Sequence, residues 1–365
     1  MKICLLTYFH ASWTKQEASI LKELGHSVYL LYPNRNRILK YLPRIPIVEV
    51  LCNYLYLCLR CIPATLWADL VLCWFVFPAG LFAALFGKLF HRPVILNAAG
   101  YDVAHLPSIN YGTSKRWYLK PLVSWALKNA TEVIAISKES ALSAEKLGAK
   151  RVKVIYEGID VGKFKPVMKR RTRKRNQYIL LTVLVLGKAG VKRKDVKSLL
   201  ESLPEVVGVF PNLRLVVVGK KGAAYPALRE TVKRLGVENN VVFKGFVPDS
   251  ELVKLYNECD VFVFPSLYES FPTACAEAQA CAKPVVTTNA ASMPEVVKNN
   301  ESGILVKPGD PQALAHAIKN LLSDSGLRRQ LGESGRKRMV RFFSKEIRKE
   351  KLQEILNTLT DYGGQ

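Results

Sequence analysis

The fold is restricted most by a regular alternation of short apolar runs and longer segments of helical composition, which repeats in both halves of the chain. In the first half, the apolar runs cover residues 2–8, 26–32, 69–75, 91–97, 132–137 and 152–156. In the second half, they cover residues 178–186, 213–218, 241–244, 261–265, 284–288 and 303–306. Strands that alternate with helices form parallel sheets. We therefore predict an α/β protein with two doubly wound halves.

The chain of 365 residues has room for about two domains. We expect a first domain at 1–165, a basic linker at 166–177, a second domain at 178–340, and a C-terminal helix at 341–365 that packs back on the first domain. The linker assignment rests on residues 169–175, of which six are basic. This run has two interpretations, a solvated linker or a contact with anionic lipid or nucleic acid.

The most apolar part of the chain lies between residues 38 and 90. Its uncharged run 70–87 has 18 residues, close to the lower limit for a membrane-spanning helix, which is roughly 17 residues. Pro78 and Gly80 interrupt it, so we favour a buried strand followed by a helix at 79–90. Upstream, basic residues are interleaved with aliphatic and aromatic ones, which is typical either of a membrane-surface segment or of a solvated basic face. These basic residues are Arg35, Arg37, Lys40 and Arg44.

The net charge of +24 is the unusual feature of the composition. It indicates anionic partners, which can be phosphorylated substrates, an anionic membrane surface or nucleic acid. We expect no nucleic acid, because no compact nucleic-acid-binding motif accompanies the charge. Eight scattered cysteines form no disulfide framework, and the pair Cys58 and Cys61 lacks further ligands at metal-binding spacing. The N-terminus has no signal-peptide pattern, so we expect a cytoplasmic protein, with the inner face of the cell membrane as a site of peripheral contact.

One strand–loop–helix–strand unit, residues 261–295, carries the clearest candidates for a ligand site. Glu269 lies in its loop, and Glu277 lies eight residues later in the helix that opens near Pro272. Helical side chains lean toward the N-terminus, so both carboxylates can face one cleft. The free N–H groups at the start of the helix favour an anion. Together these features predict a ligand with both phosphates and sugar hydroxyls.

Several sequence blocks, in the right order and at the right spacing, resemble retaining glycosyltransferases of family 4 (glycosyl transferases group 1), over nearly the whole chain. The blocks of the first half are VILNAAGYDV, TEVIAISKES and VKVIYEGIDVGKFKP. Those of the second half are LRLVVVGKKG, VVFKGFVPDSELVKLYNECDVFVFPSLYESFPTACAEAQACAKPVV and PEVVKNNESGILVKPGD. The resemblance implies a GT-B fold of two Rossmann-like domains that face each other across a cleft. The first would bind the acceptor and the second the nucleotide-sugar donor.

The resemblance also implies a reaction, the transfer of a sugar from a UDP- or GDP-linked donor to a glycan or lipid-linked acceptor, with retention and without a metal or cofactor. Glu277 is implied to accept hydrogen bonds from the ribose. Glu269 is implied to bind the donor sugar and to stabilise its transition state. The start of the helix is implied to contact sugar or phosphate through Phe271, Pro272, Thr273 and Ala274.

Charge that develops on the departing diphosphate must be neutralised. The family uses an Arg and a Lys in the loop after the first strand of the second domain, and the segment LGKAGVKRKD offers Lys188 and Lys194 there. Lys188 in place of Arg keeps the charge but loses the bidentate geometry, which the neighbouring Arg193 can supply. We therefore assign catalytic roles to Glu269, Lys194 and Lys188, and donor binding to Arg193.

On the acceptor side, the loop after the fourth strand offers Gly100, Asp102 and His105. The chain departs from the family in three places. The first loop, residues 10–16, contains no glycine, Pro272 replaces a glycine, and Ala291 and Ser292 stand where two glycines are common. These departures motivate an alternative, a catalytically silent GT-B protein that acts as a membrane or complex scaffold.

Overall fold

The protein consists of two compact units, which we describe separately from a computed structural model. The structure describes residues 1–8, 12–33, 46–109, 111–113, 116–167, 177–184 and 186–362. Unit 1 contains Met1–Tyr156 and the residues from Lys349 onward, and unit 2 contains Glu157–Arg348. The division thus falls at residue 156, nine residues before the boundary expected from the sequence. The basic run 169–175 and the four basic residues between 35 and 44 lie outside the described residues.

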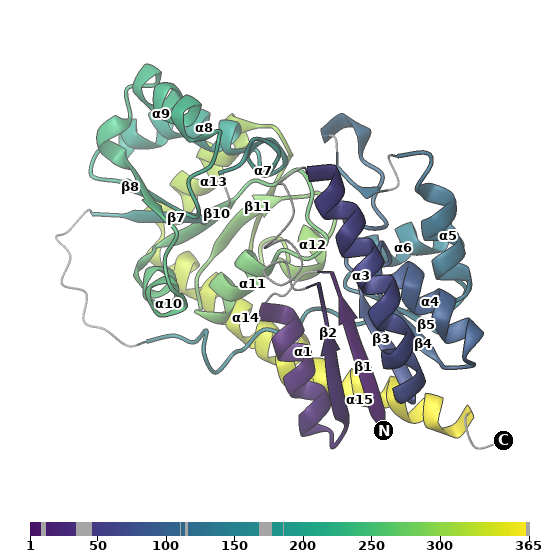
Figure 1. Cartoon of the computed structure of the whole chain (residues 1–365). Helices are drawn as coiled ribbons and strands as arrows, with labels where there is room; N and C mark the ends of the chain where they lie inside the picture. The colour runs from purple at the N-terminus through teal and green to yellow at the C-terminus, as the bar shows by residue number, and fades with distance from the viewer. Residues whose placement is uncertain are drawn as a thin grey trace. The chain divides into compact units, whose positions relative to one another are not determined.

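Unit 1 is built on a six-stranded parallel sheet in the order β2-β1-β3-β4-β5-β6 (Figure 1). Its strands are β1 (Lys2–Thr7), β2 (Ser27–Leu31), β3 (Leu70–Trp74), β4 (Val94–Ala98), β5 (Glu132–Ala135) and β6 (Val152–Val154). Every side chain of β3, β4 and β5 is buried, as expected for parallel strands covered on both faces. The order of the strands reverses between β1 and β3, where doubly wound sheets commonly bind ligands.

The helices of unit 1 are α1 (Ser12–Glu23), α3 (Pro46–Trp67), α4 (Ala79–Leu89), α5 (Lys120–Lys128) and α6 (Lys138–Lys146), with a 3-10 turn η1 (Pro107–Ile109). One face of the sheet shares a core with α3, α4 and α5. Helix α6 begins at Ser137, whose Oγ accepts a hydrogen bond from the N–H of Ser140 at 3.1 Å, an N-cap. The last helix, α15 (Lys345–Tyr362), continues into unit 1, where Lys349 pairs with Glu23 of α1 at 3.0 Å.

Unit 2 contains a second parallel sheet of six strands, in the order β12-β11-β10-β7-β8-β9. Its strands are β7 (Ile179–Val183), β8 (Arg214–Val218), β9 (Val241–Gly245), β10 (Val261–Phe264), β11 (Val285–Thr288) and β12 (Gly303–Val306). The chain leaves β7 toward β8 and β9 and later returns on its other side as β10. The carboxyl ends of β7 and β10 therefore lie next to each other at the topological switch point.

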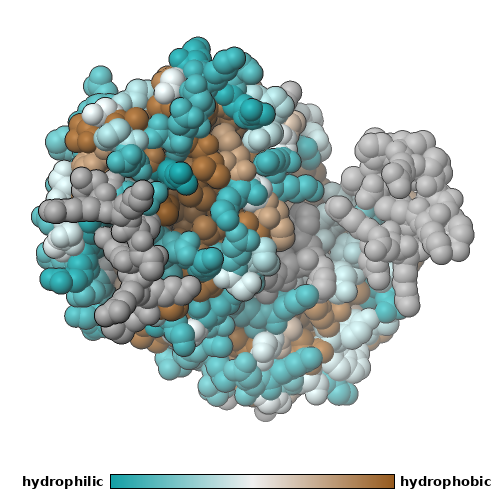
Figure 2. Space-filling view, turned by 90° about the vertical axis from the view of Figure 1, so that its left-hand side faces the viewer, coloured by the Kyte–Doolittle hydropathy of each residue, from teal (hydrophilic) through white to brown (hydrophobic). Residues whose placement is uncertain are grey.

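The helices of unit 2 are α7 (Lys188–Arg193), α8 (Val196–Val209), α9 (Tyr225–Arg234), α10 (Asp249–Glu258), α11 (Thr273–Ala280), α12 (Met293–Val296), α13 (Pro311–Ser323) and α14 (Ser325–Phe342), with a 3-10 turn η3 (Glu238–Asn240). Helices α8, α9 and α13 share a core with one face of the sheet. Hydrophilic side chains cover most of the face drawn in Figure 2, and hydrophobic ones show between them.

The α/β class and the two parallel sheets confirm the prediction from the sequence. The uncharged run 70–87 forms β3 and most of α4, as favoured, and no helix of the described chain has the length and apolar character to cross a membrane. Neither α3 nor α7 was predicted. In α3, the nearly uniform apolar composition hides the helical period, and the loop expected at 187–194 contains α7, whose Val191 packs against the core of unit 2.

Candidate functional site

A cavity of about 500 Å³ lies in unit 2 at the carboxyl ends of β7, β8 and β10. Its walls contain most of the residues that the sequence assigned to donor binding. These are Arg193, Lys194, Glu269, Phe271, Pro272, Thr273, Ala274 and Glu277. The cavity occupies the switch point of the second sheet, the place where open α/β sheets bind ligands. Segments about 80 residues apart in the chain thus contribute to one site.

The loop after β7 positions two cations of the site. Helix α7 ends at Arg193, Lys194 follows as its C-cap, and Asp195 adopts a left-handed conformation with φ of 45°. The Asp195 carboxylate then accepts a hydrogen bond from Ser198 Oγ at 2.6 Å and caps α8. This sharp turn between α7 and α8 fixes the backbone positions of Arg193 and Lys194.

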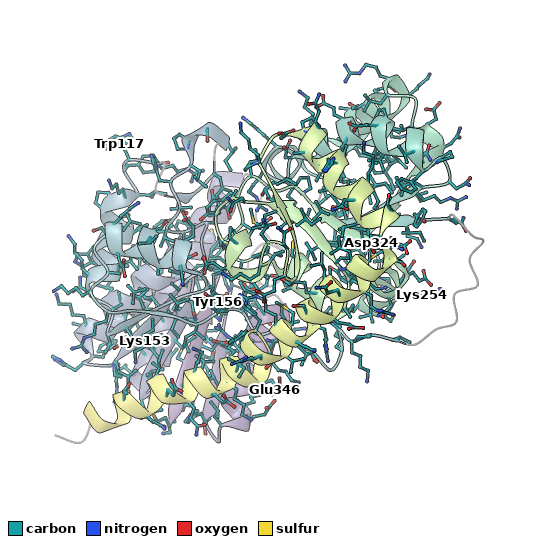
Figure 3. All side chains as sticks on the ribbon, turned by 180° about the vertical axis from the view of Figure 1, so that it is seen from behind. Trp117, Lys153, Tyr156, Lys254, Asp324 and Glu346 are labelled. Carbon is teal, nitrogen blue, oxygen red and sulfur yellow. The ribbon has the colours of Figure 1, made fainter. Side chains whose placement is uncertain are left out.

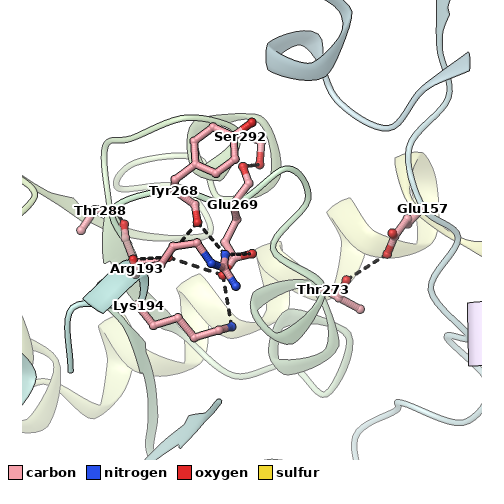
Figure 4. A network of polar contacts seen from close by, with 9 residues as sticks. Glu157, Arg193, Lys194, Tyr268, Glu269, Thr273, Thr288 and Ser292 are labelled. Carbon is pink, nitrogen blue, oxygen red and sulfur yellow. Dashed lines mark hydrogen bonds and ion pairs between the residues drawn. The ribbon is translucent and has the colours of Figure 1, made fainter. Parts of the chain in front are cut away.

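Glu269, in the loop after β10, pairs with both cations (Figure 4). Its Oε2 lies 2.7 Å from Nη1 of Arg193, and its Oε1 lies 3.1 Å from Nζ of Lys194. The three side chains are only 12–17% exposed. Lys194 Nζ also lies 4.3 Å from the centre of the Phe264 ring, a cation–π contact. Residues assigned to the sugar and to the diphosphate are therefore in direct contact with each other.

This ion-pair cluster keeps Glu269 ionised. Burial alone would raise its pKa, but Lys194 and Arg193 outweigh burial and hold the pKa of the carboxyl below its ordinary value. Removal of one partner from such a cluster would leave an uncompensated charge away from water, which is unfavourable.

A network of hydroxyl groups braces the loop that carries Glu269. Ser266 Oγ donates to the carbonyls of Arg193 and Tyr268, in each case at 3.1 Å. Ser292 Oγ donates to the Glu269 carbonyl at 2.8 Å. Ser292 is one of the two residues that replace the family's glycines, and the preceding Ala291 has a φ of 47°, a conformation that glycine adopts without strain. The departure thus keeps the backbone turn and adds a hydroxyl donor.

Helix α11 begins directly after this loop, with Pro272 as its N-cap. The N–H of Thr273 donates to the Phe271 carbonyl at 2.9 Å, and the Thr273 hydroxyl donates to Glu157 at 2.9 Å. The proline has no N–H to offer. No residue of the described chain accepts from the N–H of Ala274, which is the amide left available for an anion.

Glu277 lies one turn further along α11 and faces the same cavity. Its Oε2 accepts a hydrogen bond from the hydroxyl of Tyr256, a fully buried residue of α10, at 2.8 Å. Burial raises the pKa of Glu277 to about 7, although the Tyr256 hydrogen bond and the charge of Lys163 act in the opposite direction. Tyr256 did not stand out in the sequence, because a tyrosine on the inner side of a helix is also typical of a core.

Gly219 completes the wall at the end of β8. It has a φ of 142°, and a Cβ atom here would lie 1.6 Å from the carbonyl oxygen of Leu184, so only glycine fits. Lys220 and Phe246 line the cavity beside it, and Phe246 is 81% exposed. No role was predicted for these three residues, although the first two belong to the block LRLVVVGKKG. Lys188 begins α7, and the position of its side chain is not described.

The acceptor-side candidates lie in unit 1, after β4. Asp102 is 1% exposed, and its Oδ2 accepts hydrogen bonds from the N–H groups of Val76 at 2.7 Å and Ala99 at 3.4 Å. Its carboxylate therefore ties the loops after β3 and β4 together. Gly100 adopts a φ of 107°, and His105 is exposed. The acceptor role of the three residues stays a prediction. Among the described residues, no group of three or more acidic, His or Cys side chains could hold a metal ion.

Two family models together match most of the chain. Residues 11–163 match Glycosyltransferase Family 4, and residues 167–338 match Glycosyl transferases group 1. The chain is 30% identical to the capsular polysaccharide biosynthesis glycosyltransferase CapM of Staphylococcus aureus, over 77% of this chain and 74% of that protein. It is also 32% identical to a D-inositol 3-phosphate glycosyltransferase of Corynebacterium urealyticum, over 57% of this chain and only 51% of that protein.

Solved structures show the same fold at low identity. The sucrose-phosphate synthase of Thermosynechococcus elongatus has a TM-score of 0.80 at 20% identity, with 99% of this chain and all of that chain covered. HepE of Anabaena, solved in complex with UDP, has a TM-score of 0.77 at 19% identity, with 98% of this chain and all of that chain covered. The chain belongs to glycosyltransferase family 4 and is a glycosyltransferase with the GT-B fold.

Proposed function

We propose that this protein is a retaining hexosyltransferase that moves a sugar from a UDP- or GDP-linked donor to a hydroxyl of a glycan or lipid-linked acceptor. The observation that carries the proposal is one cavity lined by two partly buried carboxylates, Glu269 and Glu277, and by the cations Arg193 and Lys194. A nucleotide sugar has the complementary groups in the same order, with hydroxyls at both ends and a diphosphate between them.

In this proposal, Glu277 accepts hydrogen bonds from the ribose hydroxyls, held in position by Tyr256. Lys194 and Lys188 contact the diphosphate, and Arg193 supplies a planar donor pair to it. Because Arg193 and Lys194 pair with Glu269 in the present structure, a bound diphosphate would share them with that carboxylate. Glu269 would then accept hydrogen bonds from the donor sugar and stabilise the positive charge that develops on its ring.

We propose a front-face substitution as the reaction. The bond between the anomeric carbon and the phosphate oxygen breaks, and its electron pair leaves with the diphosphate. The acceptor oxygen forms its bond on the same face of the sugar, and the departing phosphate oxygen takes the acceptor proton. The three cations would neutralise the charge of the leaving group, so the proposal includes no cofactor.

The comparisons support the choice of substrates. HepE of Anabaena has been solved with UDP and with UDP-glucose. CapM is named for capsular polysaccharide biosynthesis. These proteins motivate the donor and acceptor classes proposed for this chain.

The proposal is tested by incubating the protein with UDP-, GDP- and ADP-linked sugars and detecting binding and slow hydrolysis by mass spectrometry. We expect one donor to bind and to release its nucleoside diphosphate, and NMR of the product to show retention. Glu277→Gln should weaken donor binding about 10- to 100-fold, as expected for a lost hydrogen bond to a charged group. Glu251→Gln, on the neighbouring helix α10, is the matched control and should bind normally. Absence of binding and hydrolysis with every donor would overturn the proposal.

A further inference from the structure

The outer face of helix α3 is unusually apolar for a surface that no part of the described chain covers. Leu55, Leu59 and Leu66 are 60%, 58% and 52% exposed. They recur at helical spacing on the side opposite to Leu57 and Cys61, which are buried against the sheet. A surface helix of a globular protein normally presents polar residues on this side. Between Pro46 and Trp67, however, α3 has only two charged residues, one Glu and one Arg.

The apolar surface continues onto the next two helices. Helix α3 packs against α4, and α4 packs against α5, so the three form one layer on the same face of the sheet (Figure 1). On the outside of α4, Leu85 and Leu89 are 43% and 61% exposed, and Leu122 of α5 is 40% exposed. We call this outer face, with the exposed residues of α3, α4 and α5, the leucine surface. Single exposed leucines need no explanation, but a set on adjacent helices marks an interaction site.

The exposed charge on α4 and α5 has one sign. Between Asp69 and Glu132 the sequence contains a single acidic residue, Asp102, and that residue is buried. The exposed charged side chains of α4 and α5 are therefore all basic, and Arg60 of α3 is exposed as well. In the described part of this layer, the basic exposed residues are Arg60, Lys88, Arg116, Lys120 and Lys128. An apolar surface with several exposed basic residues complements an anionic partner.

Two aromatic residues in the turn just before α5 extend this pattern. Trp117 is 83% exposed and Tyr118 is 55% exposed, and their rings meet edge to face with centroids 6.1 Å apart. In Figure 3, Trp117 lies at the periphery of the chain. Tryptophan and tyrosine favour the boundary between lipid headgroups and acyl chains, because one part of each ring system is apolar and another donates a hydrogen bond.

We propose that the leucine surface docks on a lipid bilayer that contains anionic phospholipids. The leucines insert at the boundary between headgroups and acyl chains, and the lysines and arginines contact the lipid phosphates. A bilayer fits better than a protein partner, because the basic residues are spread over a wide area and the apolar side chains are the long aliphatic and aromatic types of interfacial helices. Helix α3 then lies in the plane of the membrane without crossing it.

The test is flotation of the full-length protein with vesicles of phosphatidylcholine alone and of phosphatidylcholine mixed with phosphatidylglycerol. We expect the protein to bind the anionic vesicles and to bind the neutral ones much more weakly. The triple variant Leu55→Gln/Leu59→Gln/Leu66→Gln should lower the partition coefficient at least about tenfold, because it removes apolar surface from the contact. Lys88→Gln/Lys120→Gln should lower binding to anionic vesicles about tenfold and leave binding to neutral vesicles unchanged.

Matched controls lie in unit 2. Val209→Gln/Val340→Gln replaces aliphatic side chains that are 58% and 45% exposed, and it should bind like the unchanged protein. Circular dichroism of each variant checks that it is folded, which we expect because the three leucines are more than half exposed. The proposal is overturned if the unchanged protein does not float, or if the folded triple variant floats as well as the control. It is also overturned if the unchanged protein sediments as a dimer while the triple variant sediments as a monomer and still binds vesicles. The leucine surface would then contact a second copy of the chain and not a bilayer.

Discussion

The two units place different chemistry at the carboxyl ends of their parallel strands. In unit 2, the switch point between β7 and β10 gathers Arg193, Lys194 and Glu269 into a cluster of charged side chains. In unit 1, the loops after β3 and β4 meet through Asp102, whose carboxylate is bonded to backbone N–H groups. The first arrangement presents side-chain charges to a cavity, whereas the second uses a charge to hold two loops together.

The difference shows that a doubly wound sheet fixes where loops converge but leaves their chemistry to particular residues. The pKa values show the same contrast. Cations hold the pKa of Glu269 below its ordinary value, whereas burial without a cation raises the pKa of Asp102 to about 6. Removing either carboxylate should therefore affect a different property, catalysis for Glu269 and pH-dependent stability for Asp102.

The largest effect is expected for Glu269→Ala. The variant loses the group proposed to stabilise the transition state and leaves two cations without their carboxylate. We expect kcat to fall about 10²- to 10³-fold, the size typical of one lost electrostatic contact to a transition state. Steady-state kinetics with the donor found in the screen measures this. Glu251→Ala breaks an ion pair with Lys244 at the surface and should keep kcat within about twofold. Equal losses in both variants would contradict the role of Glu269.

Asp102 should make the stability of the protein depend on pH. Because its folded pKa of about 6 lies above the ordinary value of 3.8, the folded protein binds more protons than the unfolded chain between these values. The contribution of Asp102 to the free energy of unfolding therefore falls as pH rises from about 4 to 6, by up to about 3 kcal/mol. Urea unfolding at several pH values measures it.

Asp102→Asn keeps an oxygen acceptor for the N–H of Val76 and removes the titration. Compared with this variant, the unchanged protein should lose stability over the same pH range. Asp69→Asn is the control, since the exposed Asp69 carboxylate also accepts a backbone N–H, from Lys2 at 2.7 Å. It should show the same pH dependence as the unchanged protein. Identical slopes in all three proteins would show that Asp102 is not buried as described.

Gly219→Ala tests the wall of the cavity in unit 2. Its left-handed backbone alone costs an alanine about 1–3 kcal/mol, and the new Cβ also meets the Leu184 carbonyl. Gly236→Ala is the matched control, because Gly236 also has a positive φ, of 67°, but open space around the position of a Cβ. We expect Gly219→Ala to lower the free energy of unfolding more than Gly236→Ala and to reduce donor binding as well. Equal loss of stability in the two variants would contradict this expectation, because it would mean that the loops after β7 and β8 can move apart without a cost in free energy.

Much of this contrast could be predicted from the sequence, and the rest depends on contacts that spacing does not encode. Glu269 and the cations after β7 were all assigned to one donor molecule, which implies that they lie in one site. Their direct pairing was not predicted, because it depends on the turn at Asp195 and on the hydroxyl network around Ser266. The loop position of Asp102 was also recognised, but the direction of its side chain into the protein depends on backbone angles of the loop.

Helix α3 and Tyr256 were missed for related physical reasons. A helix that is apolar on every side gives no periodic signal, so the sequence between residues 46 and 67 did not reveal which side faces the sheet. Tyr256 resembles any buried aromatic residue until its hydroxyl is placed 2.8 Å from Glu277. In both cases, the sequence does not show toward which neighbouring element a given side of the helix points.

The smallest effect, and the sharpest test of that orientation, is expected for Tyr256→Phe. The hydroxyl stabilises the ionised form of Glu277, so its loss should raise the pKa of this carboxyl above its present value of about 7. If ionised Glu277 binds the ribose, nucleotide affinity weakens as pH falls through this pKa, and the midpoint moves to higher pH in the variant. At pH 8, where most Glu277 is ionised in the unchanged protein, we expect only about a threefold to tenfold loss of affinity, because Tyr256 acts on the ribose only through Glu277. Titration calorimetry from pH 6 to 9 measures both the loss of affinity at pH 8 and the pH of the midpoint.

The control is Tyr225→Phe, on α9, which should leave the midpoint in place. A uniform loss of affinity with an unchanged midpoint would mean that Tyr256 only fills the core, and that its contact with Glu277 does not set the charge of the nucleotide site.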